Sequence, residues 1–195
     1  MNVGVLASGE GTNLQALLDD PEIEVAAVAS DKAEALALER ARAAGVAAHC
    51  FTGYEDRSSR DRAIAGWLRE HDVELVVLAG YMQLLSDEFL SAFPQRVINV
   101  HPALLPAFPG LQAVQQALDY GVKVFGVTIH FVDGGVDTGP VILQRAVELP
   151  EARTEAEVLD RLHPIEHELL PAAVRLIARG AVTVEGRRVV VESAP

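Results

Sequence analysis

The chain has 195 residues, half of them hydrophobic, and its 28 acidic against 16 basic side chains give a formal net charge of −12. This length and composition predict one domain over residues 1–195 with a sizeable core, and they exclude a chain that is disordered throughout. The acidic balance argues against a nucleic-acid partner and against binding to an anionic membrane surface, since both attract basic patches.

Cysteine usage and the first residues of the chain indicate the compartment. Cys50 is the only cysteine, which excludes an intrachain disulfide and a cysteine-based zinc site. The opening MNVGVLASG has neither the basic nor the long apolar region of a signal peptide, and no apolar run approaches the length of a membrane span. We therefore expect a cytoplasmic protein.

Apolar runs alternate with helical patterns along the chain. Strands are expected at Asn2–Ala7, Ile23–Ser30, Ala47–Phe51, Leu75–Ala79, Val97–His101, Lys123–Val132 and Pro140–Glu148. Helices are expected at Leu14–Leu18, Lys32–Ala44, Arg60–Glu70, Ser86–Phe93, Gln112–Tyr120 and, as one helix or two, Thr154–Ala178. Ser86 is the expected N-cap of its helix, and Thr154 with Glu157 forms a capping-box pattern. A small hairpin, Ala181–Glu185 with Arg188–Val191, follows them. This order predicts an α/β fold with a mostly parallel twisted sheet, helices on both faces and an antiparallel C-terminal part.

The first expected strand runs into a glycine loop, Ser8–Asn13 (SGEGTN), that precedes a helix. Glycines let the backbone approach a ligand closely, and amide groups at a helix N-terminus favour an anion. The loop lacks the Lys-Ser/Thr ending of a P-loop, and Leu14 stands where a dinucleotide fingerprint has its third glycine. It therefore predicts a site for a single phosphate group, with a tight turn and helix cap as the alternative.

The segment Val97–Gly110 (VINVHPALLPAFPG) joins a buried strand to a proline-rich loop. Asn99 and His101 are two positions apart, so their side chains lie on the same side of the strand. They stand at the carboxyl end of the strand, where open α/β sheets bind their ligands. The pair predicts an amide donor and a proton carrier held by a stiff loop.

A second acid is expected from the glycine-rich segment His130–Pro140. A carboxylate there would favour the charged form of a nearby imidazole. From spacing alone, Asp133 and Asp137 are equal candidates, and a solvated Asp-Gly turn is the alternative.

The segment His163–His167 (HPIEH) matches the H-x-x-E-H motif of zinc peptidases. The two histidines would share a helix face, but Pro164 fits a first helical turn better than a helix interior. We therefore expect no metal site. A non-catalytic phosphosugar-binding module is a further alternative, which would explain the glycine loop and leave Asn99 and His101 unexplained.

Four segments, SGEGTNLQALL, VLAGYMQLLS, INVHPALLPAFPG and GVTIHFVDGGVDTGPVILQ, occur in an order that resembles the phosphoribosylglycinamide formyltransferase family of folate-dependent enzymes. The resemblance implies a Rossmann-like formyltransferase fold. It also implies two small-molecule substrates, 5-phosphoribosylglycinamide and the formyl donor 10-formyltetrahydrofolate. A hydrolase that removes formate from 10-formyltetrahydrofolate is the alternative, although such relatives carry an added N-terminal domain that we expect this chain to lack. We expect a monomer or a homodimer.

The resemblance also assigns roles to individual residues of this sequence. Asn99, His101 and Asp137 match the catalytic residues of the family, which favours Asp137 over Asp133. The phosphate-binding turn is matched by Gly11, Thr12 and Asn13, and an acid that contacts the glycinamide substrate by Glu166. The folate side is matched by Arg57, Met82, Gln83, Leu84, Leu85 and Asn99. Gln83 stands where some members carry Arg, and His163 where some carry Gln.

Overall fold

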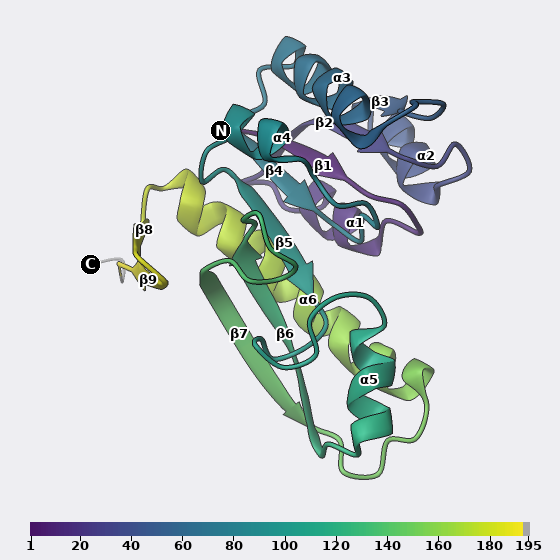
Figure 1. The fold of residues 1–195 in the computed structure, drawn as a ribbon, viewed down its shortest axis with the longest axis vertical. Helices are drawn as coiled ribbons and strands as arrows, with labels where there is room; N and C mark the ends of the chain where they lie inside the picture. The colour runs from purple at the N-terminus through teal and green to yellow at the C-terminus, as the bar shows by residue number, and fades with distance from the viewer. Residues whose placement is uncertain (193–195) are drawn as a thin grey trace. The chain divides into compact units, whose positions relative to one another are not determined.

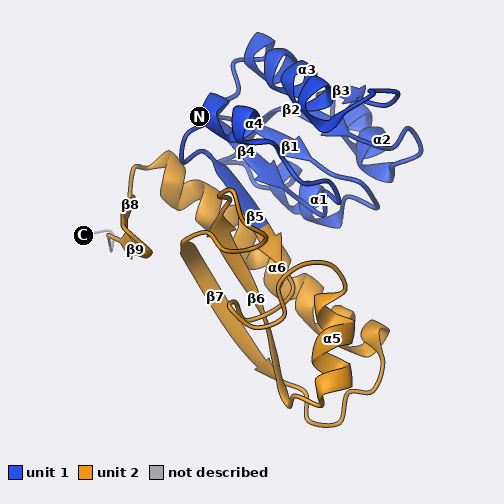
Figure 2. Ribbon diagram, in the orientation of Figure 1, with its two compact units in different colours: residues 1–99 blue, residues 100–195 orange. Residues whose placement is uncertain are grey.

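The computed structural model describes residues 1–192, and the chain divides into two compact units, Met1–Asn99 and the part that begins at Val100 (Figure 2). The boundary falls within strand β5 (Val97–His101). The single domain that we expect over residues 1–195 therefore stays a prediction.

The first unit is built on parallel strands. They are β1 (Asn2–Leu6), β2 (Glu24–Ser30), β3 (Ala47–Cys50) and β4 (Leu75–Leu78), followed by β5, in the order β3-β2-β1-β4-β5. All residues of β4 and nearly all of β1 are buried, which explains their continuous apolar sequences. The strand order reverses between β1 and β4, and such a switch point is where open α/β sheets bind ligands.

Four helices cover this part of the sheet: α1 (Thr12–Leu18), α2 (Leu36–Ala43), α3 (Arg57–Glu70) and α4 (Asp87–Ala92). Helix α1 contacts α2, and α3 contacts α4 (Figure 1). Because parallel strands are joined by right-handed crossovers, the two pairs lie on opposite faces of the sheet.

Three of these helices begin at residues that differ from the expected ones. Helix α1 begins at Thr12 rather than Leu14, directly after its N-cap residue Gly11. Helix α3 begins at Arg57 rather than Arg60, because the Asp56 carboxylate accepts a hydrogen bond from the backbone N–H of Ser59 and caps the helix there. Helix α2 begins at Leu36 rather than Lys32, since the residues before it form a separate turn. The expected Ser86 cap of α4 is confirmed by its bond from the N–H of Phe89.

The second unit contains the antiparallel strands β6 (Val124–Phe131) and β7 (Val141–Glu148), the helices α5 (Ala113–Tyr120) and α6 (Glu155–Ala178), and the hairpin of β8 (Val182–Glu185) and β9 (Arg188–Val191). Helix α6 packs along β6 and β7 and also contacts α5 (Figure 1). Over the described residues the hydrogen-bonded strand order is β3-β2-β1-β4-β5-β6-β7. The predicted mostly parallel sheet with an antiparallel C-terminal part is therefore confirmed.

Helix α6 is one helix, and the expectation that Pro164 belongs to a first helical turn is wrong. Pro164 and Pro171 both lie inside the helix. A proline in a helix interior costs about 3 kcal/mol. The helix nevertheless continues, because it buries an apolar face that includes Leu162 and Leu170, both fully buried, and each such side chain contributes about 1.5–3 kcal/mol. The predicted capping box of Thr154 and Glu157 closes its N-terminus.

Within residues 1–192, every helix falls short of the length and apolar character that crossing a bilayer requires.

The capping box predicts a measurable contribution of Thr154 to stability. The Thr154 hydroxyl accepts a hydrogen bond from the N–H of Glu157, so Thr154→Ala should lower the free energy of unfolding by about 1 kcal/mol in urea denaturation. Thr52→Ala is the control because Thr52 is an exposed loop residue, and it should change the free energy of unfolding by less than about 0.5 kcal/mol. Equal values for the two variants would contradict the prediction.

Candidate functional site

Two loops of the first unit meet at the switch point between β1 and β4. The loop after β1 and the loop after β4 are joined by a hydrogen bond of 3.0 Å from the N–H of Ser8 to the carbonyl of Gly80. Asn99 in β5 pairs with Leu78, the last residue of β4, and so lies at the same carboxyl edge. The residues predicted for the phosphate, the folate and the amide donor thus gather at one edge of this unit.

The predicted phosphate turn has a conformation that requires glycine at position 11. Gly11 has φ 74° and ψ 29°, in the left-handed region, and precedes α1 as its N-cap. A Cβ at this position would lie 2.8 Å from the Cα of Ala37, so a larger residue would clash with α2. Arg40 fixes the turn from α2 by donating from Nε to the carbonyl of Glu10 at 2.8 Å. Thr12 is half-buried in the first turn of α1, as is Asn13.

The residues predicted for the folate side lie on α3 and on the loop that follows β4. Met82 and Leu84 are more than half exposed, and Leu85 is half-buried. Gln83 accepts a hydrogen bond through Oε1 from Nη1 of Arg60 at 3.1 Å. Arg57 is three residues before Arg60 on α3, so its side chain leaves the helix on the same face.

The second unit brings His101 and Asp137 together. Nδ1 of His101 lies 3.4 Å from Oδ2 of Asp137, and Nε2 lies 2.9 Å from the carbonyl oxygen of Phe108. The imidazole is 5% exposed and the carboxylate 13%, so both are largely removed from water. Each ring nitrogen faces an acceptor, and only the doubly protonated imidazolium can donate to both.

Asp137 is held by three groups. Its Oδ2 accepts a 2.7 Å hydrogen bond from the N–H of Gly110, and its Oδ1 lies 3.5 Å from Nε2 of His130. Burial acts to raise the pKa of Asp137, but the bonds from His130 and Gly110 and the nearby charge of His101 outweigh it and hold the pKa below the ordinary value. Asp137 therefore stays ionised between two imidazoles.

Asp133, the alternative carboxylate, has a different environment. Its Oδ1 accepts hydrogen bonds from the N–H of Gly135 at 3.1 Å and from the hydroxyl of Thr138 at 2.6 Å. Asp133 thus stabilises its own turn, and Asp137 is the carboxylate beside His101.

Sequence reasoning missed His130 as a partner of Asp137. His130 is 2% exposed in β6, and its Nδ1 lies 2.8 Å from the carbonyl oxygen of Phe131. Thr128, two residues earlier, is fully buried as well. Two polar residues two positions apart in the apolar run GVTIHF repeat the pattern of Asn99 and His101, and that repeat was the available sign of a second polar face.

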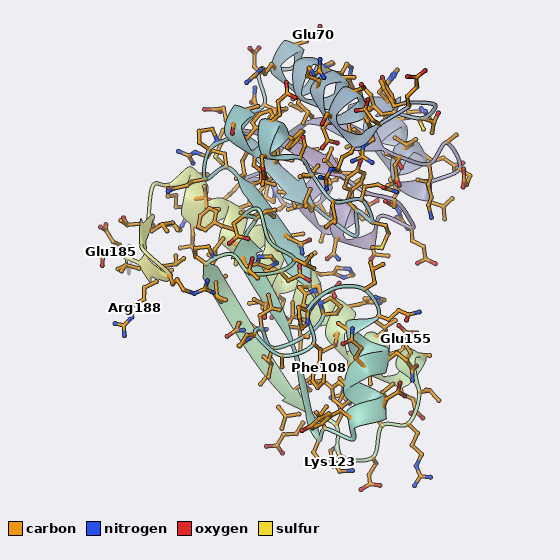
Figure 3. The ribbon with its side chains drawn as sticks, in the orientation of Figure 1. Glu70, Phe108, Lys123, Glu155, Glu185 and Arg188 are labelled. Carbon is orange, nitrogen blue, oxygen red and sulfur yellow. The ribbon has the colours of Figure 1, made fainter. Side chains whose placement is uncertain are left out.

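The loop between β5 and α5 is fixed by side chains of β6 and β7. The Thr128 hydroxyl donates to the carbonyl of Ala103 at 2.6 Å and accepts from the N–H of Leu105 at 3.2 Å. Gln144 of β7 donates from Nε2 to the carbonyl of Leu105 at 2.9 Å. Figure 3 shows Phe108 in this loop beside α5, and its ring meets that of Tyr120 with centroids 5.9 Å apart. The carbonyl that faces His101 is therefore carried by an anchored loop.

Phe108 and Asp137 share an uncommon backbone conformation. Both have φ of 52°, a left-handed value that costs a non-glycine residue about 1–3 kcal/mol. Such strain persists only where the surrounding contacts enforce it. Here it aims the Phe108 carbonyl and the Asp137 carboxylate at the same imidazole.

Glu166 and the H-x-x-E-H motif lie on α6. Glu166 is 6% exposed, and the rings of His163 and His167 stack with centroids 6.2 Å apart. Over residues 1–192, no group of three or more His, Cys, Asp or Glu side chains is arranged to hold a metal ion.

Comparisons with known proteins show which family this chain is similar to. The model of the formyl transferase family matches residues 1–174. A phosphoribosylglycinamide formyltransferase of Bacillus subtilis is 42% identical over 178 residues, which cover 88% of this chain and 91% of the relative. The crystal structure of glycinamide ribonucleotide transformylase 1 from Symbiobacterium toebii has a TM-score of 0.96 and 50% identity, covering 99% of this chain and 94% of that one.

A formyltetrahydrofolate deformylase of Pseudomonas putida KT2440 is also similar in structure. Its TM-score is 0.86 at 28% identity, and the match covers 98% of this chain but 70% of the deformylase. The two transferases are therefore more similar in sequence and are matched over more of their own length.

The lowered pKa of Asp137 predicts a stability effect in acid. Because the folded-state pKa lies below the unfolded value near 3.8, the unfolded chain takes up the proton first as the pH falls. The stabilisation is thus complete above that value and is lost below it. In urea unfolding, Asp137→Asn should lose less stability than wild type between about pH 5 and pH 3, because it has no carboxylate to protonate. Asp133→Asn, the control, should keep the wild-type loss, and an unchanged loss in Asp137→Asn would contradict the prediction.

Proposed function

Because this chain belongs to the phosphoribosylglycinamide formyltransferase family, we propose that it transfers the formyl group of 10-formyltetrahydrofolate to the amine of 5-phosphoribosylglycinamide in purine biosynthesis. The observation that carries the proposal is the buried His101–Asp137 pair, with its 3.4 Å contact and its anchored loop. His101 of this pair stands two residues after Asn99 in β5, as the resemblance requires.

The reaction is an acyl transfer that the residues of the chain would assist. The amine nitrogen of phosphoribosylglycinamide attacks the formyl carbon, a new C–N bond forms, and the formyl oxygen becomes negative. Asn99 and the imidazolium of His101 are the proposed donors to that oxygen, and one such donor contributes roughly 3–4 kcal/mol of transition-state stabilisation. On this assignment, the Nε2–H of His101 shifts from the Phe108 carbonyl to the formyl oxygen when the donor binds.

Collapse of the intermediate breaks the bond between the formyl carbon and N10, and tetrahydrofolate leaves. The attacking amine must lose a proton and N10 must gain one, and His101, Asp137 and a water are the proposed carriers. Such positioned proton transfer accelerates reactions about 10²–10⁴-fold. Asp137 keeps the imidazolium in place through its contact with Nδ1. These steps need neither a metal nor a covalent enzyme intermediate.

The binding residues are proposed from the resemblance and from their positions. The backbone turn of Gly11, Thr12 and Asn13 would hold the phosphate of the acceptor, and Glu166 would contact its glycinamide part. The folate would lie against Arg57, Met82, Gln83, Leu84, Leu85 and Asn99. We further propose that residues 1–195 form one formyltransferase domain, which acts in the cytoplasm on small molecules, as a monomer or a homodimer.

Turnover of 10-formyltetrahydrofolate with and without the acceptor tests the proposed reaction. We expect tetrahydrofolate, followed by its absorbance, to form only when phosphoribosylglycinamide is present. One molecule of acceptor should be formylated for each tetrahydrofolate released. Equal turnover without the acceptor would make the protein a hydrolase like the deformylase it resembles in structure.

Substitution of the three proposed catalytic residues tests their roles. Asn99→Ala should lower kcat about 10²–10³-fold, because it removes one donor to the developing oxyanion. His101→Ala and Asp137→Ala should each lower kcat at least about 10²-fold. Asp133→Ala is the matched control, since its carboxylate bonds Thr138 in the same loop segment, and it should stay within about threefold of wild type. Near-wild-type turnover of either Asn99→Ala or His101→Ala would overturn the assignment.

A further inference from the structure

The segment Met82–Leu85 exposes apolar side chains from a backbone that is fixed. Met82 is 53% exposed and Leu84 is 56% exposed. The N–H of Met82 donates to Oγ of Ser8 at 2.9 Å, and the carbonyl of Leu84 accepts from Nη2 of Arg60 at 3.0 Å. Exposed apolar side chains on an ordered backbone make a preorganised contact surface for a ligand.

Arg60 is the residue that joins this segment to the core of the first unit. Its Nε and Nη2 donate to Oδ1 of Asp61 at 2.9 and 2.8 Å, while Nη1 donates to Oε1 of Gln83 at 3.1 Å. Asp61 is fully buried, and the side chain of Arg60 is 12% exposed. Oδ2 of Asp61 in turn accepts from the N–H of Ser86 at 2.6 Å, directly after the segment. One planar guanidinium therefore reaches a buried carboxylate, a side-chain amide and a backbone carbonyl.

Gln83 continues the network to the other end of the segment. Its Nε2 donates to Oδ2 of Asp31 at 3.0 Å, and Oδ1 of Asp31 accepts from Oγ of Ser8 at 2.5 Å. Since Ser8 also accepts from the N–H of Met82, the bonds form a closed ring from Arg60 through Gln83, Asp31 and Ser8 to the segment itself. The ring engages both ends of the Gln83 amide in positioning the segment.

We propose that Arg60 is a positioning residue for the formyl donor: it holds Met82–Leu85 in the conformation that contacts the folate. This inference rests on the proposed function. The contacts assign the effect to the forked shape of the guanidinium, since its charge is already paired with Asp61. A lysine would keep a positive charge beside Asp61, but one ammonium cannot reach three acceptors in the plane of a guanidinium.

Arg60→Lys, compared with Arg62→Lys, tests the inference. Arg62 lies two residues further along the same helix, and its exposed guanidinium pairs with Glu88 at 3.3 Å. We expect Arg60→Lys to raise KM for 10-formyltetrahydrofolate about tenfold, with kcat and KM for phosphoribosylglycinamide within about twofold of wild type. Arg62→Lys should leave all three constants within about twofold. A parallel fall in kcat and rise in both KM values would indicate general loss of structure and would overturn the inference.

Ser8→Ala and direct binding of folic acid complete the test. Ser8→Ala opens the same ring at its far end without disturbing the buried Arg60–Asp61 pair, and it should also raise KM for the formyl donor. Calorimetric titration with folic acid needs no turnover, so it separates the two proposals. Weaker folic acid binding by Arg60→Lys in a protein that transfers no formyl group would support the inference and refute the proposed reaction. Unchanged folic acid binding by both Arg60→Lys and Ser8→Ala would overturn the inference.

Discussion

The carboxylate of Asp137 is the group on which the second unit's site depends. It is 13% exposed, accepts the N–H of Gly110 and lies within 3.5 Å of a nitrogen of each of two imidazoles. A buried carboxylate without such partners would be protonated rather than charged. The negative charge, the loop that carries Gly110 and the orientation of His101 therefore stabilise one another, and loss of any one of them would weaken the other two.

The first unit also contains a buried ion pair that orders a loop, but here the group that bonds the loop is positively charged. The guanidinium of Arg60 neutralises the fully buried Asp61 and uses its remaining donors on the loop after β4. In both units a charge that is buried and paired also orders a loop, so the cost of desolvation is offset by several hydrogen bonds rather than one. The loops are consequently part of the folded scaffold, held by hydrogen bonds from the side chains of Arg60 on α3 and Thr128 on β6.

Sequence patterns predicted the sheet well because its central strands are buried on both faces and read as uninterrupted apolar runs, as in LVVL of β4. The period of two placed Asn99 and His101 together, and a capping box placed the start of α6. The cap at Asp56 was missed because the residues around it are polar and show no apolar periodicity that would mark the start of a helix. Pro164 was misplaced because the burial of apolar side chains elsewhere on α6 keeps the helix continuous through the proline. His130 was missed because its partner is seven residues away across a turn, and spacing does not reveal such a contact.

The left-handed backbone at Asp137 restricts which amino acids a homologous protein could carry there. Among non-glycine residues, asparagine and aspartate adopt this conformation most readily, because their short polar side chains tolerate it. Glycine would adopt the left-handed conformation but has no side chain to accept hydrogen bonds. Glutamate has a carboxylate but disfavours this conformation, and asparagine lacks the negative charge. Conformation and electrostatics thus converge on one residue at position 137, which should vary less among functional sequences than either requirement alone would dictate.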